Sequence, residues 1–489
     1  WKLIHNTKTR QMTTKSLLLV LFFTISHVYS LTESNQTICP DQLPALIDQI
    51  LAKPQYVRSL WGISIKAQNN NTNDYRTLYN LNERRFFVPA SNNKVITTSA
   101  AFITYPPNYQ YTTNIYGTSD QQTFCLKAVG DPSITYDQIN EAITSLRNDF
   151  GIDSISSFIV DTSNYTGTPF PGTWEFGDLS EDYGSQPTSV IVNENNVAFT
   201  VSPTQIGKPA SIHFPEASES LTSFPITNRV ITGNSTSISY YYAMGVPSMI
   251  VEGTISSKAS PQTFTVSTQS PEQHFLDIVT YYLQANQIEF KNASLGRCEE
   301  NSSWKVYSSI VSQPLSTLMN YTLQVSDNLY AETFQLLLGA SSPAPPTTST
   351  RQAGINTVKD ILHKEFGIDE EGFFQVDGSG LSRQNLVSPD TLVNIFTQMA
   401  EQPNGNLYRS FLPLAGESGT LSSRFVGTSA QGRVEAKTGT LTGVSSLSGY
   451  AQPPAFDNII FSIVINNSEQ SASVRQQGID SIVVLLTQL

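Results

Sequence analysis

The sequence predicts a multidomain protein in which both ends of the chain build one α/β domain and mostly β material is inserted between them. Two observations lead to this fold class. The chain of 489 residues is too long for one ordinary hydrophobic core. Helical and strand patterns mix near both ends, whereas residues 105–258 are rich in Thr, Ser, Tyr, Asn, Gly and Pro and show many short strand patterns. No internal repeat accounts for this length.

The start of the chain has the features of a secretory signal. Lys15 follows Met12, an apolar run covers residues 17–25, and the small side chains Val28 and Ser30 fit cleavage after Ser30. The run is too short to cross a bilayer, although an uncleaved anchor is the alternative interpretation. We therefore expect residues 1–30 to be a signal peptide with upstream residues. The rest of the chain would be secreted, in the simplest case into a periplasm.

The charge of the chain argues against nucleic-acid binding. The formal net charge is −12, and removal of residues 1–30 takes away four basic residues and no acidic one, which gives −16. Such an acidic chain has no electrostatic reason to bind nucleic acid. Membrane contact would be peripheral at most, and a homodimer is left open.

Cysteine and histidine usage gives little support to a metal site. Cys39, Cys125 and Cys298 could form one disulfide with one free thiol, or remain three thiols. Beyond residue 30 only three histidines occur, without a His-Glu-x-x-His motif or a Cys/His cluster. We expect neither a metal nor a cofactor.

The N-terminal part of the expected α/β domain starts with a helix over residues 40–53, whose apolar side chains recur at helical spacing. Strands are expected at 61–65 and 77–79, followed by a helix that starts at Ser91 and runs to Phe102. The inserted part then contains short strand patterns, for example at 124–129, 157–160, 197–201 and 237–242.

Helical periodicity returns in the C-terminal part of the chain. Helices are expected over residues 273–288, 326–338 and 355–366, the last ending at a glycine as a C-cap would. Ser388 and Pro389 are typical of a helix start. An apolar strand at 459–465 and a helix at 472–486 complete the chain.

A serine and a lysine three residues apart could form a nucleophile and its base. Ser91 and Lys94 follow Pro89 and would share one face of the first helical turn. A lysine whose pKa is lowered by burial can accept the serine proton. Taken alone, this spacing is more often just a polar helix start.

Two further motifs are weak alone but informative in combination. Ser326-Asp327-Asn328 would ordinarily be a helix N-cap, and Lys437-Thr438-Gly439 a strand with a glycine. Together with Ser91 and Lys94, in this order, they form the signature of penicillin-binding proteins and class A β-lactamases. A Gly-x-Ser-x-Gly elbow and a Ser-His-Asp pattern are absent from the sequence.

The chain resembles the low-molecular-mass class C penicillin-binding proteins, which are serine D-Ala-D-Ala carboxypeptidases and endopeptidases. The resemblance covers essentially all residues after 30 and includes residues 88–94, 130–132, 376–383 and 437–441. The 231 residues between Lys94 and Ser326 are a further mark of this family. The implied fold is a penicillin-recognising, β-lactamase-like serine transpeptidase domain with inserted, mostly β domains. The implied limits are 31–105 with 303–489 for the catalytic domain, 106–196 with 265–302 for inserted domain II, and 197–264 for inserted domain III.

The resemblance also implies a role for each motif residue. Ser91 would attack the carbonyl of the penultimate D-alanine, Lys94 would be the base, and Lys437 would help to keep Lys94 neutral. Ser326 would pass a proton to the leaving amine, and Asn328 would hold the substrate backbone.

The remaining positions would recognise the substrate. Thr438, Gly439 and Thr440 would bind the terminal carboxylate, with the oxyanion hole at the main-chain N–H groups of Ser91 and Thr440. Arg383 and Asp161 would recognise the side chain of the peptidoglycan stem peptide, and either could instead serve only the fold.

The predicted function is thus a secreted serine-type D-Ala-D-Ala carboxypeptidase that trims peptidoglycan stem peptides, with endopeptidase activity as an addition. β-Lactam antibiotics would acylate it. The alternatives are a β-lactamase, which would turn penicillin over quickly, and a penicillin-binding sensor without peptidase activity.

Overall fold

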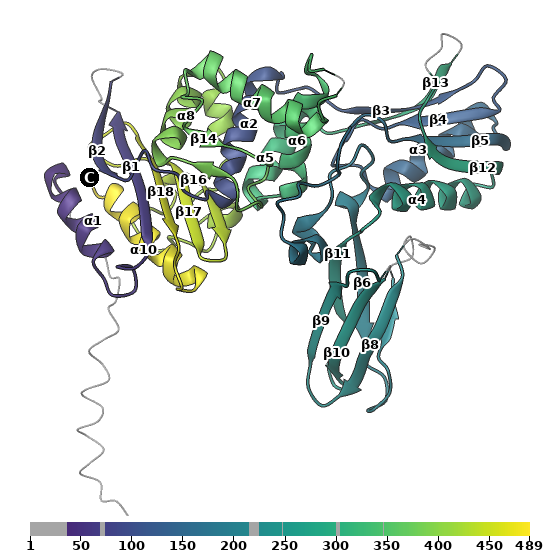
Figure 1. Cartoon of the computed structure of the whole chain (residues 1–489), viewed down its shortest axis with the longest axis horizontal. Coiled ribbons are helices and arrows are strands. Elements are labelled where there is room, and N and C mark those ends of the chain that lie inside the picture. Colours follow the sequence, from purple (N-terminus) through teal and green to yellow (C-terminus); the bar gives the residue numbers. More distant parts are fainter. Residues whose placement is uncertain (1–36, 69–73, 215–223, 247, 300–303, 346) are drawn as a thin grey trace, which may run out of the picture. The chain divides into compact units, whose positions relative to one another are not determined.

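A computed structural model describes residues 37–68, 74–214, 224–246, 248–299, 304–345 and 347–489, and Ile38–Leu489 forms one compact unit (Figure 1). The expected signal peptide at 1–30 lies outside the described residues. Among the described residues, none of the helices combines the length and the apolar character that a membrane crossing requires.

One antiparallel sheet joins the two ends of the chain. Its order is β16-β17-β18-β1-β2, formed by Val434–Leu441, Val444–Ala451, Ile459–Asn466, Leu60–Gln68 and Tyr75–Leu81. Figure 1 shows the purple N-terminal strands beside the yellow-green C-terminal strands, and Ser64 pairs with Ser462 in that register. The prediction that both ends build one α/β domain is confirmed.

Helices cover both faces of this sheet, which explains why β17 and β18 are buried along their whole length. Successive side chains of a strand point to opposite faces. Ile459, Phe461 and Ile463 therefore pack with α1 (Leu43–Leu51) and α10 (Ala472–Leu486). Ile460, between them in sequence, packs in the cluster on the other face.

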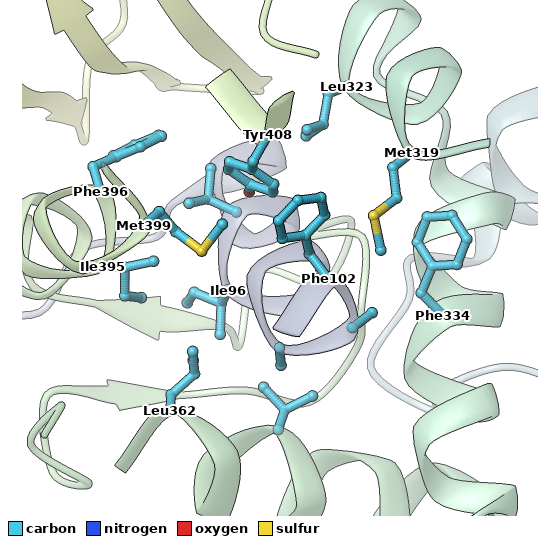
Figure 2. Close-up of a cluster of buried hydrophobic side chains, with 14 of the residues drawn as sticks. Ile96, Phe102, Met319, Leu323, Phe334, Leu362, Ile395, Phe396, Met399 and Tyr408 are labelled. Carbon is cyan, nitrogen blue, oxygen red and sulfur yellow. The ribbon is translucent and has the colours of Figure 1, made fainter. Parts of the chain in front are cut away.

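Helix α2 (Asn93–Thr104) is the centre of that other cluster. Its neighbours are α5 (Leu315–Val325), α6 (Asn328–Ala340), α7 (Thr350–Phe366), α8 (Pro389–Glu401) and the short α9 (Gly405–Arg409). Figure 2 shows Ile96 and Phe102 of α2 among side chains of these helices, including Phe334, Phe396 and Tyr408. The helix that follows Ser91 is thus enclosed by packing, which holds its first turn in place.

The described residues of the inserted part form three sheets. The first has the order β12-β5-β4-β3-β13 and packs against α3 (Tyr136–Phe150) and α4 (Pro271–Ala285). Its strands are Glu289–Gly296, Ser154–Asp161, Thr123–Lys127, Thr112–Gly117 and Lys305–Val311. The other two sheets, β8-β10-β9 and β11-β6-β7, share one apolar core. They are formed by Ile226–Gly233, Met249–Ser256, Ser237–Tyr242, Gln262–Ser267, Asn196–Ser202 and Ser211–His213.

A small two-stranded sheet, β14 (Phe373–Phe374) with β15 (Leu386–Val387), lies in the C-terminal part.

The structure adds to the sequence prediction in two places. Helices α3, α5 and the short α9 were not expected, and α3 lies in the stretch that was expected to be mostly strand. Strand β13 lies beyond the expected limit at residue 302 but pairs with β3, so the inserted sheet extends to Val311. The division into three domains otherwise stays a prediction.

A disulfide joins Cys125 of β4 to Cys298 after β12, while Cys39 is exposed and free. The two bonded residues are 173 positions apart in sequence. The bond therefore closes a long loop of the unfolded chain and lowers its conformational entropy.

Loss of this disulfide should destabilise the protein. We expect the double variant Cys125→Ser, Cys298→Ser to lose about 2–5 kcal/mol of unfolding free energy, measured by denaturant titration. Cys39→Ser is the matched control, and its unfolding curve should overlay that of the unmodified protein. Equal behaviour of the two variants would contradict the stabilising role of the bond.

Candidate active site

Ser91 lies in a short 3-10 turn that leads directly into α2. The turn depends on Ala90, which has a left-handed φ of 51° that is uncommon for a residue with a Cβ. Strand β17 holds the turn, because the hydroxyl of Ser446 donates to the Pro89 carbonyl at 2.7 Å and accepts from Asn92 Nδ2 at 2.5 Å. The local structure therefore presents the Ser91 side chain at a defined position.

Lys94 is fully buried and bonds to three oxygen atoms. Its Nζ lies 3.0 Å from Ser91 Oγ, 2.6 Å from Asn328 Oδ1 and 2.8 Å from the Ser379 carbonyl oxygen. A neutral amine has two N–H groups and one lone pair. Since the oxygen atoms of the Asn328 amide and of the Ser379 carbonyl can only accept, they take the two N–H groups, and the lone pair is left for the Ser91 hydroxyl proton.

Burial also changes the acidity of Lys94. The loss of solvation lowers its pKa from 10.5 to about 8, and the nearby carboxylates of Asp327, Asp377 and Glu332 oppose a larger fall. A lysine with such a pKa is partly neutral near pH 7, as a general base must be.

Lys437 is equally buried and supports Ser326. Its Nζ donates to Ser326 Oγ at 2.8 Å and to the carbonyl of Thr438 at 2.9 Å. Burial, and secondarily the charge of Lys94, lowers the pKa of Lys437 well below that of an ordinary lysine. The charged forms of the two lysines therefore repel each other. Of the two, only Lys94 has a hydrogen bond to Ser91, so the geometry favours Lys94 as the base.

The Ser326-Asp327-Asn328 motif contains the expected helix N-cap, which is Asp327, and places Ser326 before it at the end of another helix. Ser326 ends α5 in the left-handed region, at φ 68°, and Asp327 caps α6 by accepting from the Tyr330 N–H at 2.9 Å. Asn328 is the first residue of α6 and contacts Lys94 through its Oδ1. The tight connection between two helices brings Ser326 and Asn328 to the site.

The Lys437-Thr438-Gly439 motif lies on β16 next to the Ser91 turn. A Cβ at Gly439 would lie 2.3 Å from Ser446 Oγ and 2.6 Å from the Pro89 carbonyl oxygen, so only glycine permits this approach. Thr438 is buried, and its hydroxyl donates to the hydroxyl of Thr420 at 2.8 Å. Thr440, two residues after Thr438, is exposed.

A cavity of about 360 Å³ opens over the predicted nucleophile. Twelve residues line it: Ser91, Glu175, Asp178, Tyr183, Ser326, Asn328, Gly380, Leu381, Arg383, Thr440, Leu441 and Thr442. The structure therefore brings Ser91, Ser326, Asn328, Thr440 and Arg383 to one cavity. Behind its wall, Lys94 and Lys437 bond to Ser91 and Ser326.

Among the residues predicted to bind the substrate, Thr438, Gly439 and Asp161 do not line this cavity. Thr438 and Gly439 lie on β16 beside the Ser91 turn, whereas Asp161 lies in the inserted part. It is buried at the end of β5, and its carboxylate accepts from the main-chain N–H groups of Cys298 and Ser163. It is not among the residues that line the cavity over Ser91. Asp161 therefore holds the chain beside the disulfide, because it satisfies two main-chain donors there.

The acidic residues in the cavity are instead Glu175 and Asp178, which the sequence interpretation missed, as it missed Tyr183 and Thr420. The first three belong to the inserted part, and only the tertiary contacts place them beside Ser91. A polar stretch after Trp174 was the only available signal, and such stretches are common in loops.

Within the described ranges, one group has the spacing of metal ligands, namely Cys125, Asp161 and Cys298. Its two cysteines are joined in the disulfide, so they cannot act as thiolate ligands. This group therefore offers a metal ion a single carboxylate.

The paired Ser–Lys arrangement, Ser91 with Lys94 and Ser326 with Lys437, is that of a serine hydrolase, and a comparison with solved structures finds the same fold. The structure of penicillin-binding protein 4 from Haemophilus influenzae matches with a TM-score of 0.79 at 22% identity, covering 90% of this chain and 98% of that one. A second structure of that protein holds a β-lactam.

The family follows from the sequence comparisons. The model of the D-Ala-D-Ala carboxypeptidase 3 (S13) family matches residues 43–489. A penicillin-sensitive carboxypeptidase A from Dictyostelium discoideum is 32% identical over 87% of both chains. A D-alanyl-D-alanine carboxypeptidase from Actinomadura is 27% identical over 90% of this chain and 84% of its own length. The chain belongs to the S13 family of D-Ala-D-Ala carboxypeptidases.

The close approach at Gly439 yields a prediction. Gly439→Ala should lower the rate of Ser91 acylation by a fluorescent penicillin at least about a hundredfold, because the new Cβ displaces the Ser91 turn and the oxyanion donors with it. Gly172→Ala is the control, since a Cβ there has no atom within 4 Å. Similar rates for both variants would show that the approach is not required.

A second prediction concerns pH. If the neutral form of Lys94, whose pKa is about 8, is the base, the acylation rate should rise with pH and level off above about pH 9. The measurement is the acylation rate from pH 6 to 10, with circular dichroism at each pH to establish that the fold persists. A rate that is flat between pH 6 and 9 would contradict Lys94 as the base.

Proposed function

We propose that this protein is a serine-type D-Ala-D-Ala carboxypeptidase that acts on peptidoglycan stem peptides through an acyl-enzyme on Ser91. The observation that carries the proposal is the placement of Lys94, whose two acceptor partners leave its lone pair for the Ser91 proton. Membership of the S13 family supports the same reaction.

The first half of the reaction forms the ester. Ser91 Oγ attacks the carbonyl carbon of the penultimate D-alanine while its proton moves to Lys94 Nζ. The main-chain N–H groups of Ser91 and Thr440 are the proposed donors to the oxyanion, and such preorganised donors contribute about 3–4 kcal/mol. The peptide C–N bond then breaks, and the proton that Lys94 accepted is returned to the departing amine through the hydroxyl of Ser326, which bonds to Lys437. Lys94 is neutral again when D-alanine leaves.

The second half of the reaction regenerates the enzyme. Water attacks the ester carbonyl, the ester C–O bond breaks, and the shortened peptide leaves with a free carboxylate while Ser91 regains its proton. Lys94 is positioned to assist again, because its Nζ lies 3.0 Å from Ser91 Oγ, the atom that carries the ester.

Substrate recognition is proposed for residues around the cavity. The hydroxyls of Thr438 and Thr440 suit the terminal carboxylate of the peptide, and Asn328 suits its backbone amide. Arg383 donates to the Thr442 carbonyl at 2.7 Å and also lines the cavity, as do the acidic residues Glu175 and Asp178. The arginine suits the carboxylate of a stem-peptide side chain, and the two acidic residues suit its amine. Asp161 is not part of this proposal.

Cleavage of cross-linked peptides is proposed as an additional activity, because the leaving amine can carry a second stem peptide. Acylation by β-lactams is proposed because the relative from Dictyostelium is described as penicillin-sensitive and the Haemophilus protein holds a β-lactam in one structure. The disulfide between Cys125 and Cys298 supports export to an oxidising compartment, a periplasm or the exterior.

The test of the function uses a labelled penicillin and, separately, a pentapeptide that ends in D-Ala-D-Ala. We expect label on Ser91, release of free D-alanine, and loss of both in Ser91→Ala, which removes only the nucleophilic oxygen.

The other outcomes separate the alternatives. Label without D-alanine release would favour a sensor, and rapid loss of label with penicillin hydrolysis would favour a β-lactamase. Absence of both reactions would refute the proposed function.

A further inference from the structure

Residues 174–183 belong to the inserted part of the chain, between β5 and β6, yet they contact the partners of Lys94. The first contact is made by Tyr183, whose main-chain carbonyl accepts from Asn328 Nδ2 at 2.8 Å. Since the Nδ2 atom is used in this way, the Oδ1 atom of Asn328 faces Lys94, 2.6 Å from its Nζ. The inserted segment therefore orients the Asn328 amide so that its oxygen, and not its nitrogen, faces Lys94 Nζ.

The second contact is made by Trp174. Its indole N–H donates to Asp377 Oδ2 at 3.0 Å, and both side chains are buried. The Asp377 carboxylate also accepts from the main-chain N–H groups of Gly380 and Ser382, at 2.8 and 2.6 Å. The carboxylate thus ties the loop of residues 377–382 to an indole of the inserted segment.

This loop carries the second oxygen acceptor of Lys94, the main-chain carbonyl of Ser379. The carboxylate of Glu332 accepts from the main-chain N–H groups of Gly378 and Ser379, at 2.9 and 2.8 Å. The peptide groups on either side of Ser379 are therefore held, and its carbonyl oxygen lies 2.8 Å from Lys94 Nζ. Arg351, which pairs with Glu332, also donates to the carbonyl of Pro169, again in the inserted part.

We propose that residues 174–183 position the catalytic base: Trp174 acts through Asp377 and the Ser379 carbonyl, and the Tyr183 carbonyl acts through Asn328. These two routes fix the acceptors of both N–H groups of Lys94 and so leave its lone pair facing Ser91. Trp174 is a positioning residue, because it touches neither substrate nor the reacting atoms. This inference rests on the proposed function and extends it by giving the insertion a part in catalysis.

The charges around Lys94 give the inference a pH signature. Burial raises the pKa of Asp377 to about 6, and the indole N–H of Trp174 works against this rise. Lys94 faces the carboxylates of Asp377, Asp327 and Glu332, which favour its ammonium form, and repels the Lys437 amine. Removal of the indole N–H raises the Asp377 pKa further, weakens its negative charge and so lowers the pKa of Lys94.

The test compares Trp174→Phe with Trp61→Phe. Trp61 is also buried, but its Nε1 has no hydrogen-bond partner among the described residues, so this control loses the same atoms without losing a bond. For D-alanine release from the pentapeptide, we expect Trp174→Phe to lower kcat at least about tenfold, the effect of one buried hydrogen bond to a charged group, with KM within about threefold. The acid limb of its pH–rate profile should move to lower pH, whereas that of Trp61→Phe should not move.

Several outcomes would overturn the inference. Equal kcat values and pH profiles for the two variants would show that Trp174 serves only packing. A rise in KM with unchanged kcat would likewise contradict a role in positioning the base. If Trp174→Phe does not fold, benzothienylalanine at position 174 keeps the bicyclic shape and lacks only the N–H. It should show the same loss of kcat. An unmodified protein that releases no D-alanine would refute the proposed function instead, before any variant is compared.

Discussion

The removal of the Lys94 amine from water is the physical condition on which the site depends. An isolated ammonium group in a protein interior costs several kcal/mol, so burial favours the neutral amine that a base requires. The same burial demands hydrogen-bond partners for each N–H group. Asn328 and the Ser379 carbonyl meet this demand, and they come from segments more than 200 residues away in sequence. Three carboxylates nearby limit how far the pKa falls.

Close packing of backbone on backbone is the second requirement. Gly439 brings β16 against the Ser91 turn, and Gly380 places the 377–382 loop against the same turn, where a Cβ would lie 2.0 Å from the Ala90 carbonyl oxygen. Ala90 and Ser326 adopt left-handed conformations that cost energy locally. The enclosing core around α2 (Figure 2) supplies the packing that keeps these conformations in place.

The insertion contributes to the site in two ways. Glu175, Asp178 and Tyr183 line the cavity over Ser91. Trp174 and the Tyr183 carbonyl reach behind the cavity wall to the partners of Lys94. One short segment thus connects the lining of the cavity over Ser91 with the hydrogen-bond partners of Lys94.

The sequence alone indicated the motif residues and many of the regular elements, because their signals are local. Ser91 and Lys94 are one helical turn apart, and the apolar spacing of α10 and the apolar run of β18 have the periods of a helix and a buried strand. Helix α3 was also readable, since Thr135 and Gln138 form a capping box before Ile139, Ile143 and Leu146. The abundance of strand patterns around it concealed that signal.

Only the tertiary structure decided how distant residues pair. Asp161 and Asp178 are each followed by a polar stretch in the sequence. The pairing of β5 with β12 places Asp161 next to Cys298, whereas Asp178 lines the cavity over Ser91. The Cys125–Cys298 bond, the joining of β13 to β3 and the Trp174–Asp377 hydrogen bond have the same origin. Each depends on contacts between residues far apart in the chain, for which the sequence carries no periodic or spacing signal.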